Sequence, residues 1–156
     1  MNSFYRSLTP TATLNEDEIV ITSFTGNKRT YIRDHIWLAG FAMLFGMAAL
    51  WLFGNAHVWT GAVGGFFAIS IRGFYLASDD LKARWDLTNQ RIMGPQERIA
   101  DLTEIVEMKV IISSVQLITQ SGLKHLIRFQ ADPQDTIAQI EKAKISNAAH
   151  GGQSSD

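Results

Sequence analysis

The sequence predicts a membrane-anchored protein in which a hairpin of two transmembrane helices is joined to a small, mainly β domain. Three observations predict this fold class. No Asp, Glu, Lys or Arg occurs between Asp34 and Arg72, two long apolar stretches fill that interval, and the segment after it alternates short strand-forming runs with turn residues. The average composition hides this division, because a net charge of -1 and 46% hydrophobic residues would also suit a soluble domain.

Both apolar stretches have the length of a membrane span. Residues 36–53 would extend about 27 Å as a helix, close to the hydrocarbon thickness of a bilayer. Residues 58–77 are interrupted only by Arg72, which lies near the end of the stretch and can extend its guanidinium to the lipid headgroups. The alternative is a helical hairpin buried inside a soluble protein, but such helices keep a polar face and neither stretch has one. We therefore expect a transmembrane hairpin over residues 35–77.

Charges around the hairpin predict its orientation. Basic residues precede the first stretch and follow the second, whereas residues 54–57 between them carry none. Positively charged flanks remain on the cytoplasmic side of a membrane, so we expect a multi-pass protein with both termini in the cytoplasm. The flanking basic residues are Lys28, Arg29, Arg33, Arg72, Lys82, Arg84 and Arg91.

Small residues recur four positions apart on both predicted helices. In lipid, helices associate through close backbone contact, for which such faces are suited. They either pack the hairpin against itself or dock a second membrane protein or a second copy of the chain. The residues are Ala42 and Gly46 on the first helix, and Gly61, Gly64, Gly65 and Ala68 on the second.

Short strands are predicted on both sides of the hairpin. Residues 1–13 read as a flexible tail, and residues 14–34 as a cytoplasmic strand around Ile19 followed by a basic segment. A final helix is expected from Asp132, a suitable N-cap before Pro133, to about Ile145, and residues 146–156 are expected to be disordered. Further strands are expected at 84–88, 91–93, 98–100, 106–110, 115–119 and 126–130.

Five segments with a characteristic order and spacing cover roughly residues 14–145. They are Leu14-x-x-x-Glu18-Ile-Val, Trp85-Asp-Leu-Thr-Asn-Gln-Arg91-Ile, Leu102-Thr-Glu-Ile105-Val, Val115-Gln-Leu-Ile-Thr119 with Gly122, and Ala131-Asp-Pro-Gln-Asp-Thr-Ile137. Together they resemble the bacterial pleckstrin-homology (PH) domain membrane proteins. The resemblance implies that residues 78–145 form a PH-like antiparallel β-barrel or sandwich capped by the C-terminal helix, in a protein of the bacterial inner membrane. Some members of that family look like helpers or scaffolds for membrane machinery.

Residues that would support catalysis are scarce. The chain has no cysteine, which excludes disulfides, thiolate metal sites and cysteine nucleophiles. The four histidines have no second ligand at metal-binding spacing, and no phosphate-binding glycine loop or nucleophile elbow occurs. The balanced charge gives no support for nucleic-acid binding. We expect a protein that is not an enzyme and that has no metal, cofactor or nucleic acid.

The combination of hairpin and PH-like domain favours a membrane-anchored module that scaffolds, assembles or stabilises a membrane protein complex. Its expected partners are membrane lipids and another membrane protein or a second copy of itself. Two alternatives stay open. One is an accessory subunit of a transporter or enzyme complex. The other is a module that senses lipid headgroups through Arg72, Lys82, Arg84 and Arg91.

Overall fold

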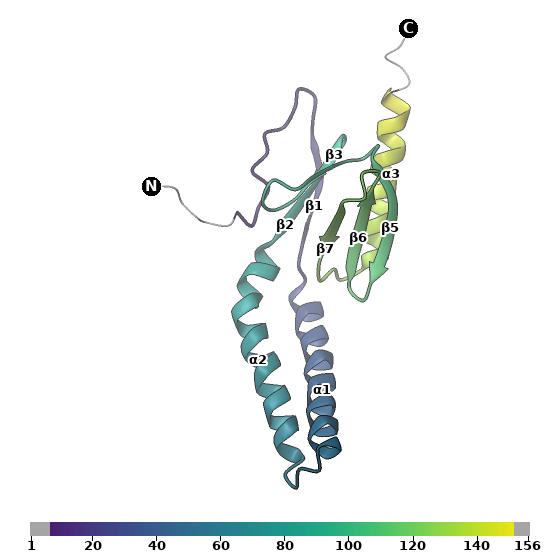
Figure 1. Ribbon diagram of the computed structural model, residues 1–156. Coiled ribbons are helices and arrows are strands. Elements are labelled where there is room, and N and C mark those ends of the chain that lie inside the picture. Colours follow the sequence, from purple (N-terminus) through teal and green to yellow (C-terminus); the bar gives the residue numbers. More distant parts are fainter. Residues whose placement is uncertain (1–6, 152–156) are drawn as a thin grey trace.

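The computed structural model describes residues 7–151, which form an elongated molecule with a helical hairpin at one end and two β-sheets with a third helix at the other (Figure 1). The hairpin consists of α1 (Lys28–Leu52) and α2 (Trp59–Lys82). The helices cover the predicted spans except for Phe53 and Val58, which cap them at the turn, and both continue beyond the spans toward the sheets. The turn between them begins at Gly54, whose positive φ of 68° suits a glycine after a helix end.

Close backbone contact holds the hairpin together. Gly46 and Gly61 face each other so closely that a Cβ on either would collide with the backbone carbonyl of the other. A Cβ on Gly65 would lie 2.5 Å from the carbonyl oxygen of Ala42. A Cβ on Gly64, in contrast, would meet nothing within 4 Å. The face of Ala42 and Gly46 on α1 therefore packs against the face of Gly61 and Gly65 on α2.

The apolar side chains of the hairpin point outward. In the most apolar 18-residue window of α1 no residue is buried, and in that of α2 6% are. Both helices are long and apolar enough to cross a membrane. A hairpin at the centre of a soluble protein would have these side chains covered by protein, which is not what the described residues show.

The first sheet contains strands from both sides of the hairpin. Its order is β1 (Val20–Thr25), β2 (Arg84–Thr88), β3 (Arg91–Met93) and β4 (Ile99–Asp101), all antiparallel. Thr25 pairs with Arg84, so the two helices occupy the place of a turn between neighbouring strands. The expected PH-like unit of residues 78–145 therefore lacks the first strand of its own sheet.

The second sheet is a three-stranded meander. Its order is β5 (Ile105–Ile111), β6 (Ser114–Thr119) and β7 (Lys124–Ile127). Among the described residues no strand pair joins it to the first sheet, so the two sheets are separate and unclosed. The prediction of antiparallel sheets is confirmed, whereas a closed barrel is not.

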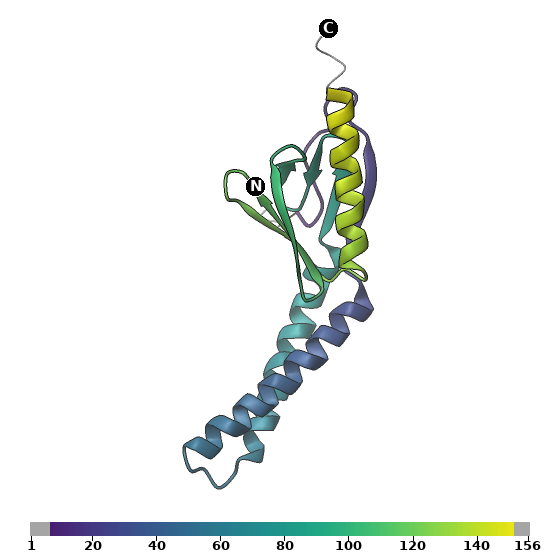
Figure 2. The same cartoon turned by 90° about the vertical axis from the view of Figure 1, so that its right-hand side faces the viewer.

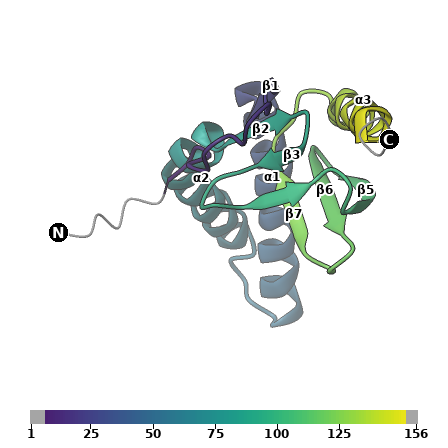
Figure 3. The ribbon, with the colours of Figure 1, turned by 90° about the horizontal axis from the view of Figure 1, so that it is seen from above.

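The C-terminal helix α3 (Pro133–Gly151) lies on the side of the sheets away from α2 and runs away from the hairpin (Figure 1, Figure 3). Asp132 caps it as predicted, because its Oδ1 accepts hydrogen bonds from the backbone N–H groups of Gln134 and Asp135. The helix continues past the expected end at Ile145. Its extra turn is held by Asn147, whose amide donates to the carbonyl of Asn89 at 2.6 Å.

The core lies between the two sheets and α3. Trp85, Leu87 and Ile92 contribute from the first sheet, and Val115, Leu117 and Ile127 from the second. Ile140 and Ala143 close it from α3. This arrangement follows from the alternation of side chains along β6, where every second residue is buried.

Parts of the two terminal segments that were expected to be flexible or disordered are ordered in the structure. Residues 1–6 and 152–156 of the expected flexible segments lie outside the described residues. Residues 7–13 contact the domain, since the carbonyls of Leu8 and Thr13 accept hydrogen bonds from Arg84 and Arg91. Residues 146–151, expected to be disordered, belong to α3.

Candidate functional site

The junction between hairpin and sheets contains several polar contacts that connect the helices to the strands. The side chain of Asn27 caps α1 by accepting from the N–H groups of Arg29 and Thr30. Its own backbone N–H donates to the carbonyl of Phe129, directly after β7, at 2.7 Å. The first turn of α1 is thereby attached to the second sheet as well as to β1.

An aromatic cluster fixes the two helices to each other at the same level. The buried ring of Tyr31 stacks on His35 at 4.0 Å and contacts the ring of Phe129 edge-on at 4.8 Å. Its hydroxyl donates to the carbonyl of Gly73 on α2 at 2.7 Å. Gly73 must remain small, because a Cβ there would lie 2.8 Å from the imidazole of His35.

Two polar contacts connect the hairpin to the second sheet. The hydroxyl of Ser113, in the β5–β6 connection, donates to the carboxylate of Asp34 on α1. Arg128, just after β7, forms an ion pair with Asp80 on α2 at 3.1 Å. Each helix is therefore tied to the sheet by its own side-chain contact, in addition to the chain connections through β1 and β2.

A groove of about 610 Å³ runs between the hairpin and the β5–β6 connection, and we call it the junction groove. Its polar lining contains Asp34, Arg72, Asp80 and Arg128. Within the part of the chain that the structure describes, Arg72 makes no hydrogen bond or ion pair. The apolar lining includes Trp37, Leu38, Phe41 and Leu76 from the helices, Ile111 and Ile112 from the connection, and Leu126 and Phe129 at the end of β7.

The chemistry of the junction groove is that of an amphipathic site. A free guanidinium lies beside an apolar wall that continues down α1. Such a wall suits an acyl chain, and a guanidinium suits a phosphate. The groove can therefore accept a molecule with an anionic head and an apolar tail.

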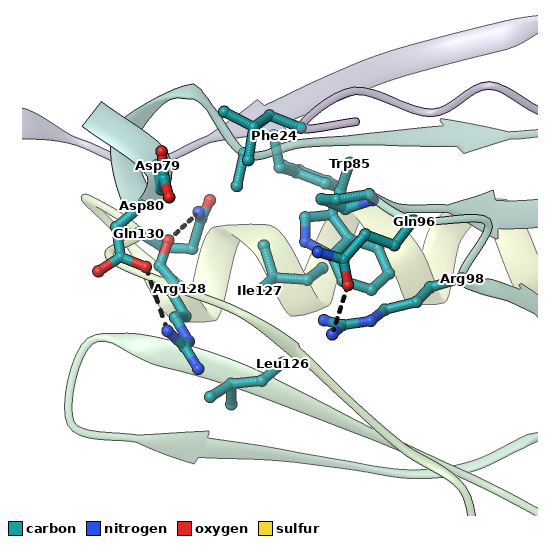
Figure 4. A pocket seen from close by; sticks show the side chains of 13 residues that line it. Phe24, Asp79, Asp80, Trp85, Gln96, Arg98, Leu126, Ile127, Arg128 and Gln130 are labelled. Atoms are coloured by element: carbon teal, nitrogen blue, oxygen red, sulfur yellow. Dashed lines mark hydrogen bonds and ion pairs between the residues drawn. The ribbon is translucent and has the colours of Figure 1, made fainter. Parts of the chain in front are cut away.

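A smaller cavity of about 170 Å³ opens between the two sheets beside the end of α2 (Figure 4). The Asp80–Arg128 pair lies at one end, and Gln96 and Arg98 lie at the other, with the buried ring of Trp85 beside them. Ligand pockets usually measure about 300–1,000 Å³. This cavity therefore suits a few water molecules better than an organic ligand.

The candidate lipid-binding cations are not gathered in one place. Arg72 lines the junction groove, and Lys82 lies exposed in the last turn of α2. Arg84 pairs with the buried Asp86 at 2.9 Å. Arg91 lies at the far end of β2 and β3 from the hairpin, so the four do not form one patch.

Arg91 is fully engaged by Glu18. Its Nε and Nη2 each donate to a different carboxylate oxygen of Glu18 at 2.9 Å, a bidentate geometry. Burial would raise the pKa of Glu18, but hydrogen bonds from Arg91, the Asn15 backbone and Thr88 outweigh burial and lower that pKa. The hydrogen bond to Glu18, together with the negative charges of Glu18 and Asp101, raises the pKa of Arg91 despite its burial. This pair fixes the segment before β1 and leaves no guanidinium for a lipid.

The histidines are dispersed. His35 packs in the aromatic cluster, His57 lies in the turn between the helices, and His125 points into the space between the sheets. Burial lowers the pKa of His125, as does the charge of Arg98, and its Nε2 has no hydrogen-bond partner among the described residues. In residues 7–151 no three His, Cys, Asp or Glu side chains are grouped to hold a metal ion.

No motif in the sequence indicates the contacts that build the junction. Asp34 and Ser113 are 79 residues apart, and Asp80 and Arg128 are 48 apart. Each of these residues looks like an ordinary charge or turn residue when read alone. Only Arg72 could be recognised beforehand, because a charge within an apolar stretch is unusual.

Comparison with protein families, with curated proteins and with solved structures finds no match for this chain.

Proposed function

We propose that this protein is a non-enzymatic, membrane-anchored PH-like module that scaffolds, assembles or stabilises a membrane protein complex. The observation that carries the proposal is the fixed connection between hairpin and sheets. The hairpin occupies the place of the β1–β2 turn, and the Asp34–Ser113 and Asp80–Arg128 contacts fasten each helix to the second sheet. A domain attached in this way has one orientation on the membrane, which is what a platform for other proteins requires.

The proposed location is the bacterial inner membrane, with the sheets and both termini in the cytoplasm. Lys28, Arg29 and Arg33 at the start of α1 and Lys82 at the end of α2 support this orientation. The turn at residues 54–57 carries no Lys or Arg and would face the other side.

The PH-like assignment is also part of the proposal. Four antiparallel strands, then three, then a helix packed on the core are compatible with the order expected of a PH domain. A fold of this kind hosts many functions, so the scaffold role depends on the way the domain is anchored and not on the fold.

The proposed contact surface for a partner is the outward face of α2. Gly46 and Gly61 contact each other within the hairpin and are therefore not available to a partner. A Cβ on Gly64 would meet nothing within 4 Å, and Ala68 is exposed. Phe67 is exposed beside them. Small residues next to an aromatic side chain allow another helix to approach closely in lipid.

Crosslinking in native membranes, followed by purification in mild detergent, tests this function. We expect the full-length protein to capture a defined membrane protein or a second copy of itself. Gly64→Leu should abolish the capture without disturbing the hairpin, because that position is open. Gly40→Leu is the matched control on α1, where a side chain also meets nothing within 4 Å. A chain that always elutes alone would contradict the proposal.

A second candidate function is recognition of anionic lipid in the junction groove, and the unpaired Arg72 specifically favours it. Native mass spectrometry of the detergent-purified protein should then show retained phospholipid that Arg72→Gln loses. Lys82→Gln serves as control, because Lys82 is outside the groove. Equal lipid retention in both variants would count against this candidate.

A further inference from the structure

The connection between β5 and β6 combines two features that are unfavourable in water. Ile112 is 86% exposed and Ile111 is 44% exposed, so two large apolar side chains lie at the tip of a two-stranded projection. Ile112 also has a positive φ of 58°. A β-branched residue is a strong outlier in that conformation, which turns normally assign to Gly or Asn.

Five non-glycine residues in the described part of the chain have positive φ, and two of them lie at the junction. Among the described residues the bulky apolar side chains with positive φ are those of Ile112 and Phe129. Phe129 packs on Tyr31 in the aromatic cluster, so its side chain has a clear packing role. Ile112, in contrast, is 86% exposed, and it retains a large side chain where glycine would relieve the strain. Strained, exposed residues of this sort point to a function for the side chain.

The tip lies beside the place where α1 becomes wholly apolar. Ser113 is bonded to Asp34, the last charged residue of α1, and Ile111 and Ile112 line the same groove as Trp37 and Phe41. At 1.5 Å per residue, Trp37 and Phe41 lie about 5 and 10 Å farther along the helix than Asp34. Figure 2 shows the β5–β6 projection reaching down from the sheets to the upper part of the hairpin.

The charges around the tip suit a membrane surface. Arg72 and Arg128 line the groove beside it together with Asp34 and Asp80. Arg128 pairs with Asp80 and is more than half exposed, which leaves the guanidinium of Arg72 as the cation without an ion pair among the described lining residues. Apolar residues flanked by arginines and a tryptophan are typical of segments that lie in the interface of a bilayer.

We propose that the Ile111–Ile112 tip inserts into the cytoplasmic leaflet and is a third membrane contact of the protein, beside the two helices. The partner is the lipid bilayer itself. This inference rests on the hairpin crossing the membrane, which is part of the proposed function. The insertion would hold the second sheet against the membrane and prevent the β domain from tilting about the helix ends.

Single-cysteine labelling tests the insertion directly, because the chain has no cysteine of its own. A nitroxide is attached to the full-length variant Ile112→Cys in vesicles of phosphatidylethanolamine and phosphatidylglycerol, and its accessibility to oxygen and to a water-soluble nickel complex is measured. Ile111→Cys provides a second label that does not alter the strained residue.

Two control positions calibrate the measurement. Phe45→Cys lies in α1 at a position that is 78% exposed, and Leu123→Cys lies in the β6–β7 turn, at the opposite end of the same sheet, at 60% exposure. We expect the labels at 111 and 112 to favour oxygen severalfold over the label at 123, and to be shallower than the label at 45.

The possible outcomes separate the two proposals. Water-exposed labels at 111 and 112 combined with a lipid-exposed label at 45 would overturn the insertion and leave the hairpin assignment intact. A label at 45 that is also in water would overturn both. Labels at 111 and 112 that neither reagent reaches would indicate a protein contact at the tip and would likewise overturn the insertion.

Discussion

The helical hairpin and the β domain differ in what their packed surfaces are made of. In the β domain, large side chains such as Leu87, Ile92 and Leu117 are completely covered. In the hairpin, the helices meet through glycine and carbonyl groups, and their large side chains point outward. The buried residues of α1 and α2, namely Thr30, Tyr31 and Gly73, all lie at the end next to the sheets.

This difference is the one expected if the two regions face different solvents, water for the β domain and, as proposed above, lipid for the hairpin. Removing apolar surface from water stabilises the β domain, so its side chains face inward. The same force is absent between helices in lipid, where association depends on close packing of small residues. Substitutions should therefore have opposite consequences in the two regions: loss of volume should damage the domain, and gain of volume should damage the hairpin.

The largest effect is expected for Leu117→Ala in β6. Leu117 is fully buried between the sheets, so truncation leaves a cavity and should lower the free energy of unfolding by about 4 kcal/mol. Urea unfolding of the full-length protein in mild detergent, followed by tryptophan fluorescence, measures this change. Leu123→Ala, at an exposed turn position, should change stability by less than about 0.5 kcal/mol. Equal effects would show that the domain core is not where we place it.

Glu18→Gln should cost about 3 kcal/mol, because it leaves the guanidinium of Arg91 without its charged partner in a nearly closed site. The effect should depend on pH. The pKa of Glu18 is below its ordinary value of 4.5, so the unfolded chain takes up the proton first and the stabilisation disappears as pH falls below about 4.5. Unfolding curves of wild type and variant should therefore converge in acid.

The control for the Glu18 prediction is Glu107→Gln. Glu107 pairs with Lys109 at 2.9 Å, but both side chains are about half exposed. Loss of this pair should change stability by less than about 0.5 kcal/mol at any pH. Curves for Glu18→Gln that remain parallel to wild type down to pH 3 would contradict the assigned role of the carboxylate.

Gly61→Leu should damage the hairpin by gain of volume. The new side chain would collide with the backbone of Gly46 and should cost about 2 kcal/mol while forcing the helices apart. Double electron–electron resonance measures the distance between spin labels attached to Phe45→Cys and Phe67→Cys. This distance should increase by roughly 2 Å, toward the spacing of ordinary helix pairs. Gly64→Leu, at an open position, should leave that distance unchanged. If both variants behave alike, the observed helix contact is wrong.

The smallest effect is expected for His125→Leu. The pKa of His125 is below its ordinary value of 6.5, so the unfolded chain binds the proton more readily and wild-type stability falls as pH drops below 6.5. The variant should lack this slope and should differ from wild type by about 1 kcal/mol or less at pH 7, since it also removes an unpaired buried nitrogen. Thermal unfolding of wild type and variant between pH 5 and 7 measures how the stability of each depends on pH. A retained slope would assign the titration to another group.

The features predicted well from the sequence are those that depend on neighbouring residues. Strands β2 and β3 have the predicted bounds, because turn residues separate them, and Asp132 caps α3 because a cap acts within one turn. The length and apolar character of α1 and α2 could also be predicted, because each depends only on one contiguous stretch of residues. Such features need no knowledge of distant parts of the chain.

The features that were missed depend on contacts between distant residues. The membership of β1 in the first sheet requires pairing across the whole hairpin. In the strand expected at 106–110, the alternation of apolar with charged residues predicts that Val106 faces inward. It is 57% exposed, because an irregularity between Ile105 and Glu107 shifts the register. Arg91 looked available to lipids because its partner Glu18 is 73 residues away.

The insertion of the hairpin between paired strands also determines the order of events during synthesis. Strand β1 leaves the ribosome before either helix, but its partner β2 follows the second helix. Until both helices have been synthesised, β1 has no partner strand, and Glu18 has no Arg91 to bind. The first sheet can therefore be completed only after the hairpin has folded back and brought β2 beside β1, which makes the hairpin the step on which assembly of the β domain depends.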